Sequence, residues 1–253
     1  MLTLSALTLI AFAAGLIDAA VGGGGLVQIP GIFAMLPGYT AATLFGTNKF
    51  ASICGTATAS WRYSRSVDIA WRLVIPAAIT AFACSFLGAL AVSHIPKDLM
   101  RPLVLTLMIL MLIYTLWKKD FGHLHRPAHI GTREMVIALL IGGAIGFYDG
   151  FFGPGTGSFL IFLFIRFFGF DFLRASAAAK VVNLATNLAA LSVFIPHGDV
   201  LFHYAIPMAA ANIGGSIFGA RLAMKGGTQL IRQLFIALVS VLIAKLAWDT
   251  FHS

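Results

Sequence analysis

The chain has 253 residues, of which 59% are hydrophobic and only 10% are charged, and its mean hydropathy is +0.93. These values lie far from those of an ordinary soluble domain, and they exclude that class. The formal net charge of +8 is typical of loops that face anionic lipid, and it does not indicate a nucleic-acid partner. The composition therefore predicts an integral membrane protein whose surroundings are the lipid bilayer.

Apolar segments separated by short polar breaks follow one another along the chain. In the first half they lie near 2–21, 25–37, 41–61, 70–92 and 100–117, and in the second near 133–152, 155–168, 173–195, 202–222 and 230–248. Long uncharged runs of this kind predict helices and not the alternating strands of a barrel. We therefore expect an all-α polytopic membrane protein with about five helical segments in each half.

The second segment of each half is short. With about 13 residues it makes about 20 Å of helix, which cannot cross a hydrocarbon core of about 30 Å unaided. It is either a short tilted helix or one arm of a re-entrant hairpin, and both alternatives stay open.

The two halves of the chain repeat each other at a shift of 131 residues without gaps. The motif from Gly15 to Gly24 falls on the motif from Gly146 to Gly155, and Lys49 falls on Lys180. A repeat this long is half of a protein and not a solenoid unit, and in an apolar chain it indicates a duplicated transporter. The predicted divisions are a first repeat at 1–120, a cytoplasmic linker at 121–132 and a second repeat at 133–253.

The basic residues indicate how the repeats are oriented. If each half crosses the membrane an odd number of times, 12 of the 17 basic residues lie on one side and 3 on the other, with Lys49 and Lys180 inside the membrane. An even number of crossings would split the same residues 8 against 7, which is no bias. Cytoplasmic loops are the basic ones, so we expect inverted-topology repeats with both termini in the periplasm. The twelve residues are Arg62, Arg65, Arg72, Lys118, Lys119, Arg126, Arg133, Arg166, Arg174, Arg221, Lys225 and Arg232.

Ionisable side chains occur at matching places inside the apolar segments. Asp18 and Asp149 lie in the first segment of each repeat, and Lys49 and Lys180 lie in the third. Inversion would bring them to one axis near the bilayer midplane, where ionisable residues are candidates for function. Two interpretations remain open and can coexist. The residues form structural salt bridges, or the lysines help to hold an anion while an aspartate takes up a proton or organises the pocket.

Glycine-rich breaks precede both short segments. They allow a ligand to approach the backbone, and the N-terminus of the helix that follows favours an anion. Close helix packing alone is the alternative explanation of such breaks. The predicted substrate-binding residues are Lys49, Lys180, Asn48, Asn183, Asn187, Gly22, Gly23, Gly24, Gly25, Gly153, Gly155 and Thr156, and the predicted proton-coupling residues are Asp18 and Asp149.

Four stretches resemble the TauE/SafE sulfite-exporter family, and within it the YfcA-like subgroup. They are Gly15–Gly25, the Thr-Asn-Lys of 47–49, Gly146–Ser158 and Ala179–Leu188. The resemblance covers nearly the whole chain. It implies a multi-pass permease of the bacterial inner membrane that carries small anions, often sulfur-containing ones such as sulfite, sulfoacetate, thiosulfate or an organosulfonate. Asn48 is matched by Ala179, so any site is only approximately symmetric.

We therefore expect a secondary transporter of small anions, with proton coupling as an open option and a passive anion channel as the alternative. An intramembrane enzyme is disfavoured, because the sequence has neither HExxH nor GxSxG. No cofactor or metal site is expected, since Cys54 and Cys84 lie in apolar segments without a CxxC spacing. The anion, the direction of transport and the oligomeric state stay open.

The charge distribution predicts that the C-terminus is periplasmic. A reporter that is active only in the periplasm, fused after Ser253, should be active, and a reporter active only in the cytoplasm should be silent. A cytoplasmic C-terminus would contradict both the inverted repeats and the placement of the site.

Overall fold

The computed structural model describes residues 2–92, 106 and 131–226, and within these ranges every regular element is a helix. The helices are α1 (Leu2–Val21), α2 (Gly24–Met35), α3 (Ala41–Ser64), α4 (Trp71–Val92), α6 (Thr132–Phe151), α7 (Thr156–Phe168), α8 (Phe172–Phe194) and α9 (Phe202–Met224). Their ends lie within three residues of the predicted segments. Apart from residue 106, the predicted segments near 100–117 and 230–248, and the linker up to residue 130, lie outside the described residues.

The all-α polytopic membrane fold is confirmed. Among the described helices, α1, α4, α6 and α8 are long and apolar enough to cross a membrane, whereas α2 and α7 are apolar but shorter. Large apolar side chains such as Leu9, Ile79 and Leu140 lie on the outside with more than 60% of their surface exposed. Lipid, and not water, is the surrounding that such a surface requires.

Local sequence sets where α3 and α8 begin. The Thr40 hydroxyl accepts the N–H of Thr43 at 3.1 Å, and the Asp171 carboxylate accepts the N–H of Arg174 at 2.8 Å. Each side chain caps the first turn of its helix, where the N–H groups have no intrahelical partner. Thr40 and Asp171 are matching positions of the two repeats, so α3 and α8 begin with the same type of side-chain N-cap.

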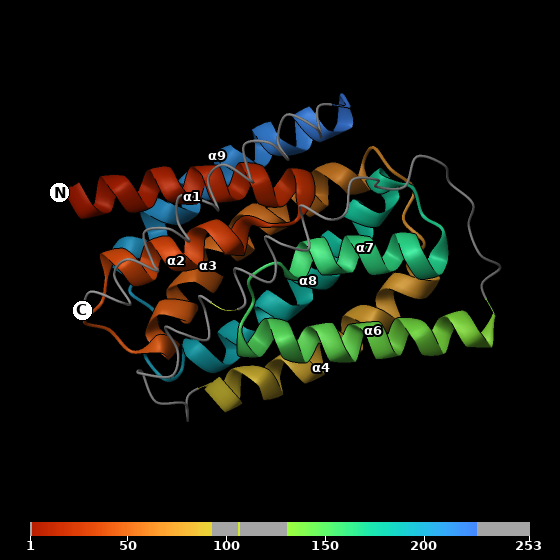
Figure 1. Cartoon of the computed structure of the whole chain (residues 1–253), viewed down its shortest axis with the longest axis horizontal. Coiled ribbons are helices and arrows are strands. Elements are labelled where there is room, and N and C mark those ends of the chain that lie inside the picture. The colour runs from red at the N-terminus through yellow and green to blue at the C-terminus, as the bar shows by residue number, and fades with distance from the viewer. Residues whose placement is uncertain (1, 93–105, 107–130, 227–253) are drawn as a thin grey trace.

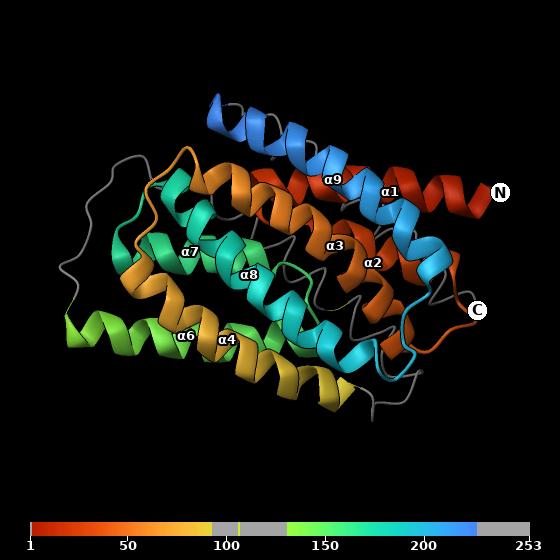
Figure 2. The same ribbon diagram turned by 180° about the vertical axis from the view of Figure 1, so that it is seen from behind.

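The helices form two layers, and each layer contains two helices of the first half and the two matching helices of the second half. Figure 1 shows α1, α2, α7 and α6 in one layer, and Figure 2 shows α9, α3, α8 and α4 in the other. In Figure 1, α1 runs from left to right and α2 runs back beside it, whereas α6 runs from right to left and α7 runs back. The glycine-rich breaks therefore reverse the chain and do not merely kink a helix. Matching helices of the two halves run in opposite directions.

The halves are joined chiefly through α1 against α9 and α4 against α6. Small residues allow these backbones to approach closely: Gly142, Gly146 and Gly150 of α6 lie against Ala77, Ala81 and Ser85 of α4. A Cβ atom on Gly146 would lie only 2.4 Å from the backbone oxygen of Ala81. Membrane helices use such small-residue faces because van der Waals packing must replace the hydrophobic effect.

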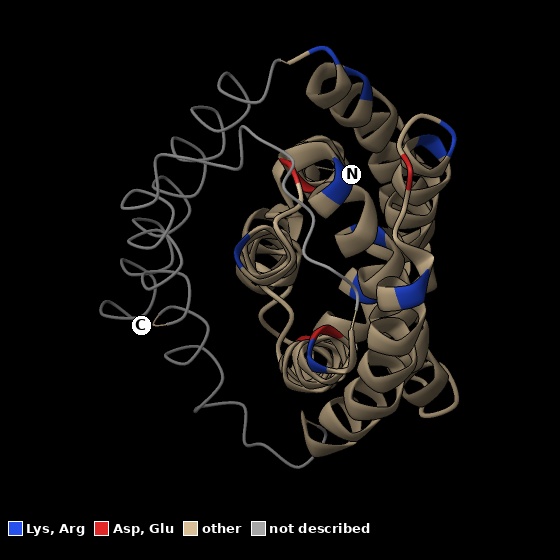
Figure 3. Cartoon of the chain, turned by 90° about the vertical axis from the view of Figure 1, so that its right-hand side faces the viewer, with Lys and Arg blue, Asp and Glu red and all other residues tan. Residues whose placement is uncertain are grey.

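Basic residues gather at one end of the molecule. Figure 3 looks at the right-hand end of Figure 1, where Lys and Arg appear at the near ends of the helices. This end carries the last turns of α3, α7 and α9, which hold Arg62, Arg166 and Arg221. The described loops at the opposite end, 36–40 and 195–201, contain neither Lys nor Arg.

We expect Gly146→Ala to destabilise the protein by about 1–3 kcal/mol, because the added methyl group must push α4 and α6 apart. The measurement is thermal unfolding of the purified protein in detergent. Gly38→Ala is the matched control, since nothing lies within 4 Å of a Cβ atom there. An unchanged unfolding temperature in Gly146→Ala would contradict this packing.

Candidate functional site

The two glycine-rich breaks lie against each other in the middle of the molecule. The N–H of Ser158 donates to the backbone oxygen of Gly22 at 2.9 Å, and the Ser158 hydroxyl donates to the backbone oxygen of Val21 at 2.9 Å. Gly22 has a φ of +84°, and a Cβ atom on it would lie 2.4 Å from the backbone carbon of Gly157. Both the left-handed conformation and the close contact therefore require glycine at position 22.

Two helix N-termini face one cavity as a result. α2 begins at Gly24 and α7 begins at Thr156, immediately after the breaks, and both residues line the cavity. The first N–H groups of a helix have no intrahelical partner, and together they carry a partial positive charge. Because the breaks come from opposite halves, the cavity receives this charge from both.

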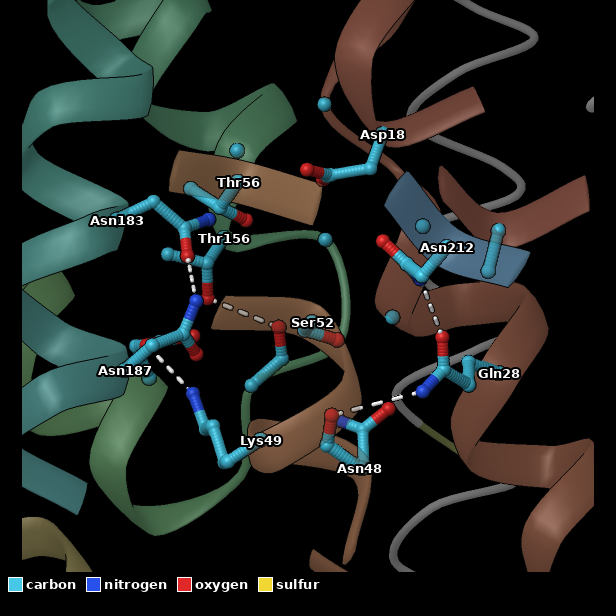
Figure 4. A pocket seen from close by; sticks show the side chains of 18 residues that line it. Asp18, Gln28, Asn48, Lys49, Ser52, Thr56, Thr156, Asn183, Asn187 and Asn212 are labelled. Carbon is cyan, nitrogen blue, oxygen red and sulfur yellow. Dashed lines mark hydrogen bonds and ion pairs between the residues drawn. The ribbon is translucent and has the colours of Figure 1, made fainter. Parts of the chain in front are cut away.

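The cavity is small and polar, with about 30 Å³ open to the centres of water molecules. Figure 4 shows side chains from α1, α2, α3, α8 and α9 converging on it. Its lining consists of Ala14, Asp18, Gly22, Gly24, Gly25, Gln28, Asn48, Lys49, Ser52, Thr56, Asp149, Gly153, Gly155, Thr156, Gly157, Asn183, Asn187 and Asn212.

Two buried ion pairs connect the halves crosswise. Lys49 Nζ of α3 lies 2.6 Å from Asp149 Oδ2 of α6, and both side chains are at most 4% exposed. Lys180 Nζ of α8 lies 2.7 Å from Asp18 Oδ2 of α1. In each pair the lysine comes from one half and the aspartate from the other, so each pair spans the interface between the halves.

The two pairs differ in their surroundings. Lys49 and Asp149 both line the cavity. Lys180 is fully buried outside the lining, and it also donates to the backbone oxygen of Asp18. The carboxylate of Asp18 does line the cavity and is 16% exposed. One lysine therefore faces the cavity, and the other is held between a carboxylate and a carbonyl.

Buried amides supply most of the remaining polar groups. Asn187 Nδ2 donates to Asn183 Oδ1 at 2.9 Å within α8, and Asn212 Nδ2 donates to Gln28 Oε1 at 2.9 Å between α9 and α2. Asn48 is 4% exposed, and its Oδ1 has no hydrogen-bond partner among the described residues. A buried oxygen without a partner is costly, and water or a ligand in the cavity would satisfy it.

The structure brings nearly all the predicted site residues together. Lys49, Asn48, Asn183, Asn187, Gly22, Gly24, Gly25, Gly153, Gly155, Thr156, Asp18 and Asp149 all line the cavity, whereas Gly23 and Lys180 do not. Gly23 precedes the first turn of α2, and Lys180 reaches the lining only through Asp18. Whether these residues bind a substrate or couple protons stays a prediction.

Six lining residues were not among the predicted site residues: the small residues Ala14 and Gly157 and the polar residues Gln28, Ser52, Thr56 and Asn212. Ser52 and Thr56 follow Lys49 at i+3 and i+7, so the spacing already placed them on its face. Gln28 and Asn212 are matched across the repeat by Phe159 and Ala81. A search for polar residues at matching positions cannot find them, but a lone amide inside an apolar helix is a signal in its own right.

This lining offers donors from both helix N-termini, five amide side chains and one ammonium group in a water-poor setting. A small anion could be desolvated there, because backbone N–H groups and a lysine replace its hydration. The same cavity also holds two carboxylates, Asp18 and Asp149, which accept protons.

Comparison with known proteins gives a consistent family. The family model of the sulfite exporter TauE/SafE matches residues 7–246. A probable membrane transporter of Haemophilus influenzae is 33% identical over 98% of this chain and 97% of its own length. The probable membrane transporter YfcA of Escherichia coli K12 is 33% identical over 98% of this chain and 91% of its own. A probable membrane transporter of a Sinorhizobium species is also 33% identical, over 96% and 91%. No solved structure matches.

Removing one partner of a buried pair should cost more than removing both. We expect Lys180→Met to lower the free energy of unfolding by about 3–5 kcal/mol, because Asp18 is left with an uncompensated charge. The double variant Asp18→Asn, Lys180→Met should recover much of that loss. Thermal unfolding in detergent measures both. Arg174→Met is the control, because its partly exposed pair with Asp171 contributes about 1 kcal/mol or less. A double variant no more stable than Lys180→Met would contradict the pairing.

Proposed function

This chain belongs to the TauE/SafE family of sulfite exporters, and from that premise we propose that it is a secondary transporter of small sulfur-containing anions. The class comprises sulfite, sulfoacetate, thiosulfate and organosulfonates. The protein is a membrane transporter and not an enzyme. The substrate, its site and the coupling are the proposed part, and the bacterial inner membrane is the proposed location.

One observation carries the proposal: a buried lysine faces a cavity that receives two helix N-termini from opposite halves of the chain. Lys49 contributes a full positive charge, and the first turns of α2 and α7 contribute partial ones. In a low-dielectric interior these charges attract an anion far more strongly than they would in water.

Each lining group then has a role. The Lys49 ammonium and the N–H groups at Gly24 and Gly157 would donate to the oxygens of the anion. Asn183, Asn187 and Asn48 would bind further oxygens or the waters that remain. Gly22 and Gly153 would keep side chains away from the path, as close approach to backbone requires.

The arrangement of the halves supports a transport mechanism by inverted repeats. Matching helices run in opposite directions in Figure 1, and the cavity lies where the two breaks meet. In transporters built this way the site lies near the bilayer midplane, and one bundle rocks against the other to open it to each side in turn. The basic end in Figure 3 would face the cytoplasm. This orientation agrees with the periplasmic termini that the charge distribution of the sequence predicts.

The size of the cavity favours alternating access over a passive channel. With about 30 Å³ open to the centres of water molecules, it is a small local site and not a continuous path, so we infer that the helices move to admit and release the anion. A channel needs a continuous wet path and no such movement. Coupling separates the two: a transporter accumulates its anion against a gradient, and a channel only equilibrates it.

The proposal is tested with the purified protein in liposomes. Labelled sulfite, thiosulfate, sulfoacetate and methanesulfonate are offered from one side, with a pH gradient and then with a protonophore. We expect at least one anion to accumulate and the accumulation to collapse with the protonophore. Flux that only equilibrates identifies a channel, and no flux of any of these anions overturns the proposed substrate class.

Lys49→Met should lower transport of the anion found in this screen by at least about tenfold, because loss of one partner of a buried charged contact costs about 2–5 kcal/mol. Lys49→Arg keeps the positive charge and should retain a larger share of the activity. Initial rates are compared at equal amounts of folded protein in the liposomes. A Met variant that transports at the parent rate would place Lys49 outside the site.

A further inference from the structure

We propose that the two buried ion pairs have different tasks: Lys49–Asp149 opens to exchange its carboxylate for the anion, while Lys180–Asp18 stays closed as a brace between the halves. The inference rests on the proposed function, because it assumes that the cavity binds an anion. It adds that Asp149 takes up one proton for each monoanion bound.

The charges around the cavity require a compensating proton. Within the described residues, its charged groups are Lys49, Asp149 and Asp18 in the lining, and Lys180 bound to Asp18. Two positive and two negative charges sum to zero. A monoanion that entered without a proton would leave a net negative charge in a low-dielectric site, which is strongly unfavourable.

Geometry selects Asp149 as the carboxylate that accepts this proton. Lys49 and Asp149 both face the cavity, so an anion that binds Lys49 competes with the Asp149 carboxylate, whose Oδ2 lies 2.6 Å from the ammonium nitrogen. Lys180 does not face the cavity, and its second acceptor is the backbone oxygen of Asp18. Protonation of Asp18 would release a lysine that no anion in the cavity can reach.

Apart from Asp149 itself and Lys49 of α3, the one other charged residue in the lining is Asp18 of α1, and its carboxylate is paired with Lys180. Asp149 lies on α6, and α7 and α4 contribute no charged residue to the lining, while α8 contributes only amides there. The titratable hydroxyl of Tyr148, next in the chain, is already engaged as a donor to the backbone oxygen of Pro154 at 2.6 Å. Lys49 from α3 is therefore the one charged partner of Asp149 among the described residues.

The exchange is a simple sequence of protonation and ligand replacement. A proton from the aqueous side adds to the Asp149 carboxylate and gives a neutral carboxylic acid, and the contact with Lys49 weakens. The anion then takes the freed ammonium group, and the loaded cavity is neutral again. Release on the other side reverses both steps, so one proton crosses with each monoanion and no net charge moves.

The charge balance also selects among the proposed substrates. A monoanion, such as hydrogen sulfite or a sulfonate, needs one proton, and the one carboxylate–lysine pair that faces the cavity, Lys49–Asp149, can take it up. A dianion such as thiosulfate would need a second proton, and the brace would have to open to provide one. The site is therefore matched to small monovalent oxyanions.

Binding of methanesulfonate tests this, because it remains a monoanion over the working range of pH. Calorimetric titration of the purified protein in two buffers that differ in ionisation enthalpy counts the protons taken up. We expect one proton per anion, with affinity falling about tenfold per pH unit on the alkaline side. Proton uptake of zero in the wild type overturns the inference, and this measurement needs no variant to fold.

Three variants then assign the proton. Asp149→Asn should bind methanesulfonate with no proton uptake and no pH dependence, and in liposomes it should exchange anion for anion without accumulating it. Asp18→Asn should be less stable but should still take up one proton, as should the matched surface control Asp68→Asn. Loss of proton uptake in Asp18→Asn and not in Asp149→Asn would overturn the division of tasks.

The outcomes keep the two proposals apart. If the wild type binds none of methanesulfonate, sulfite and thiosulfate, the proposed anion site itself is wrong, and this inference is wrong with it. If an anion binds but thiosulfate is bound with the same single proton and equal affinity, the preference for monoanions is overturned while anion transport stands.

Discussion

The crosswise pairing of two buried lysines with two buried aspartates is the constraint on which the rest of the structure depends. Lys49 binds Asp149 and Lys180 binds Asp18, so each charge is neutralised by the opposite half of the chain. An uncompensated charge at this depth would cost several kcal/mol, and neither half can supply both partners in this geometry. The halves must therefore stay together, and they must stay in register, for either to tolerate its own lysine.

Close backbone contact makes that pairing possible. The reach of a lysine side chain is limited, and the breaks must lie against each other before Lys49 and Lys180 can meet their partners. Gly22 against Gly157 and Gly146 against Ala81 bring the backbones nearer than any larger residue would allow. The sequence suggests that the glycine-rich breaks allow a ligand to approach the backbone. In the structure, glycines also set the distance between the halves.

The sequence predicted the helices and most of the site for a physical reason. Long apolar segments have one stable state in lipid, so α1 and α4 could be placed to within a residue. Asp18, Lys49, Asp149 and Lys180 stood out because charge in such segments is costly. Which lysine pairs with which aspartate could not be predicted, because the partners lie 100 and 162 residues apart and only packing brings them together. The Gln28–Asn212 contact was missed because neither residue has a polar counterpart in the other repeat.

The two halves of the site differ, and this difference would assign the anion to one lysine and the proton to one aspartate. A perfectly symmetric cavity would present two equivalent lysines, and a single anion could not be balanced by a defined proton. Here the amide pair of Gln28 and Asn212 lies on one side, and Lys180 is withdrawn behind Asp18. That leaves Lys49 as the ammonium group facing the cavity among the described residues. In the proposed mechanism, Lys49 exchanges the Asp149 carboxylate for an anion, so one of the two ion pairs between the halves opens while the other stays closed. The Lys180–Asp18 brace would then be the pivot about which the halves move, and the neutral loaded site would let them move without carrying charge through lipid.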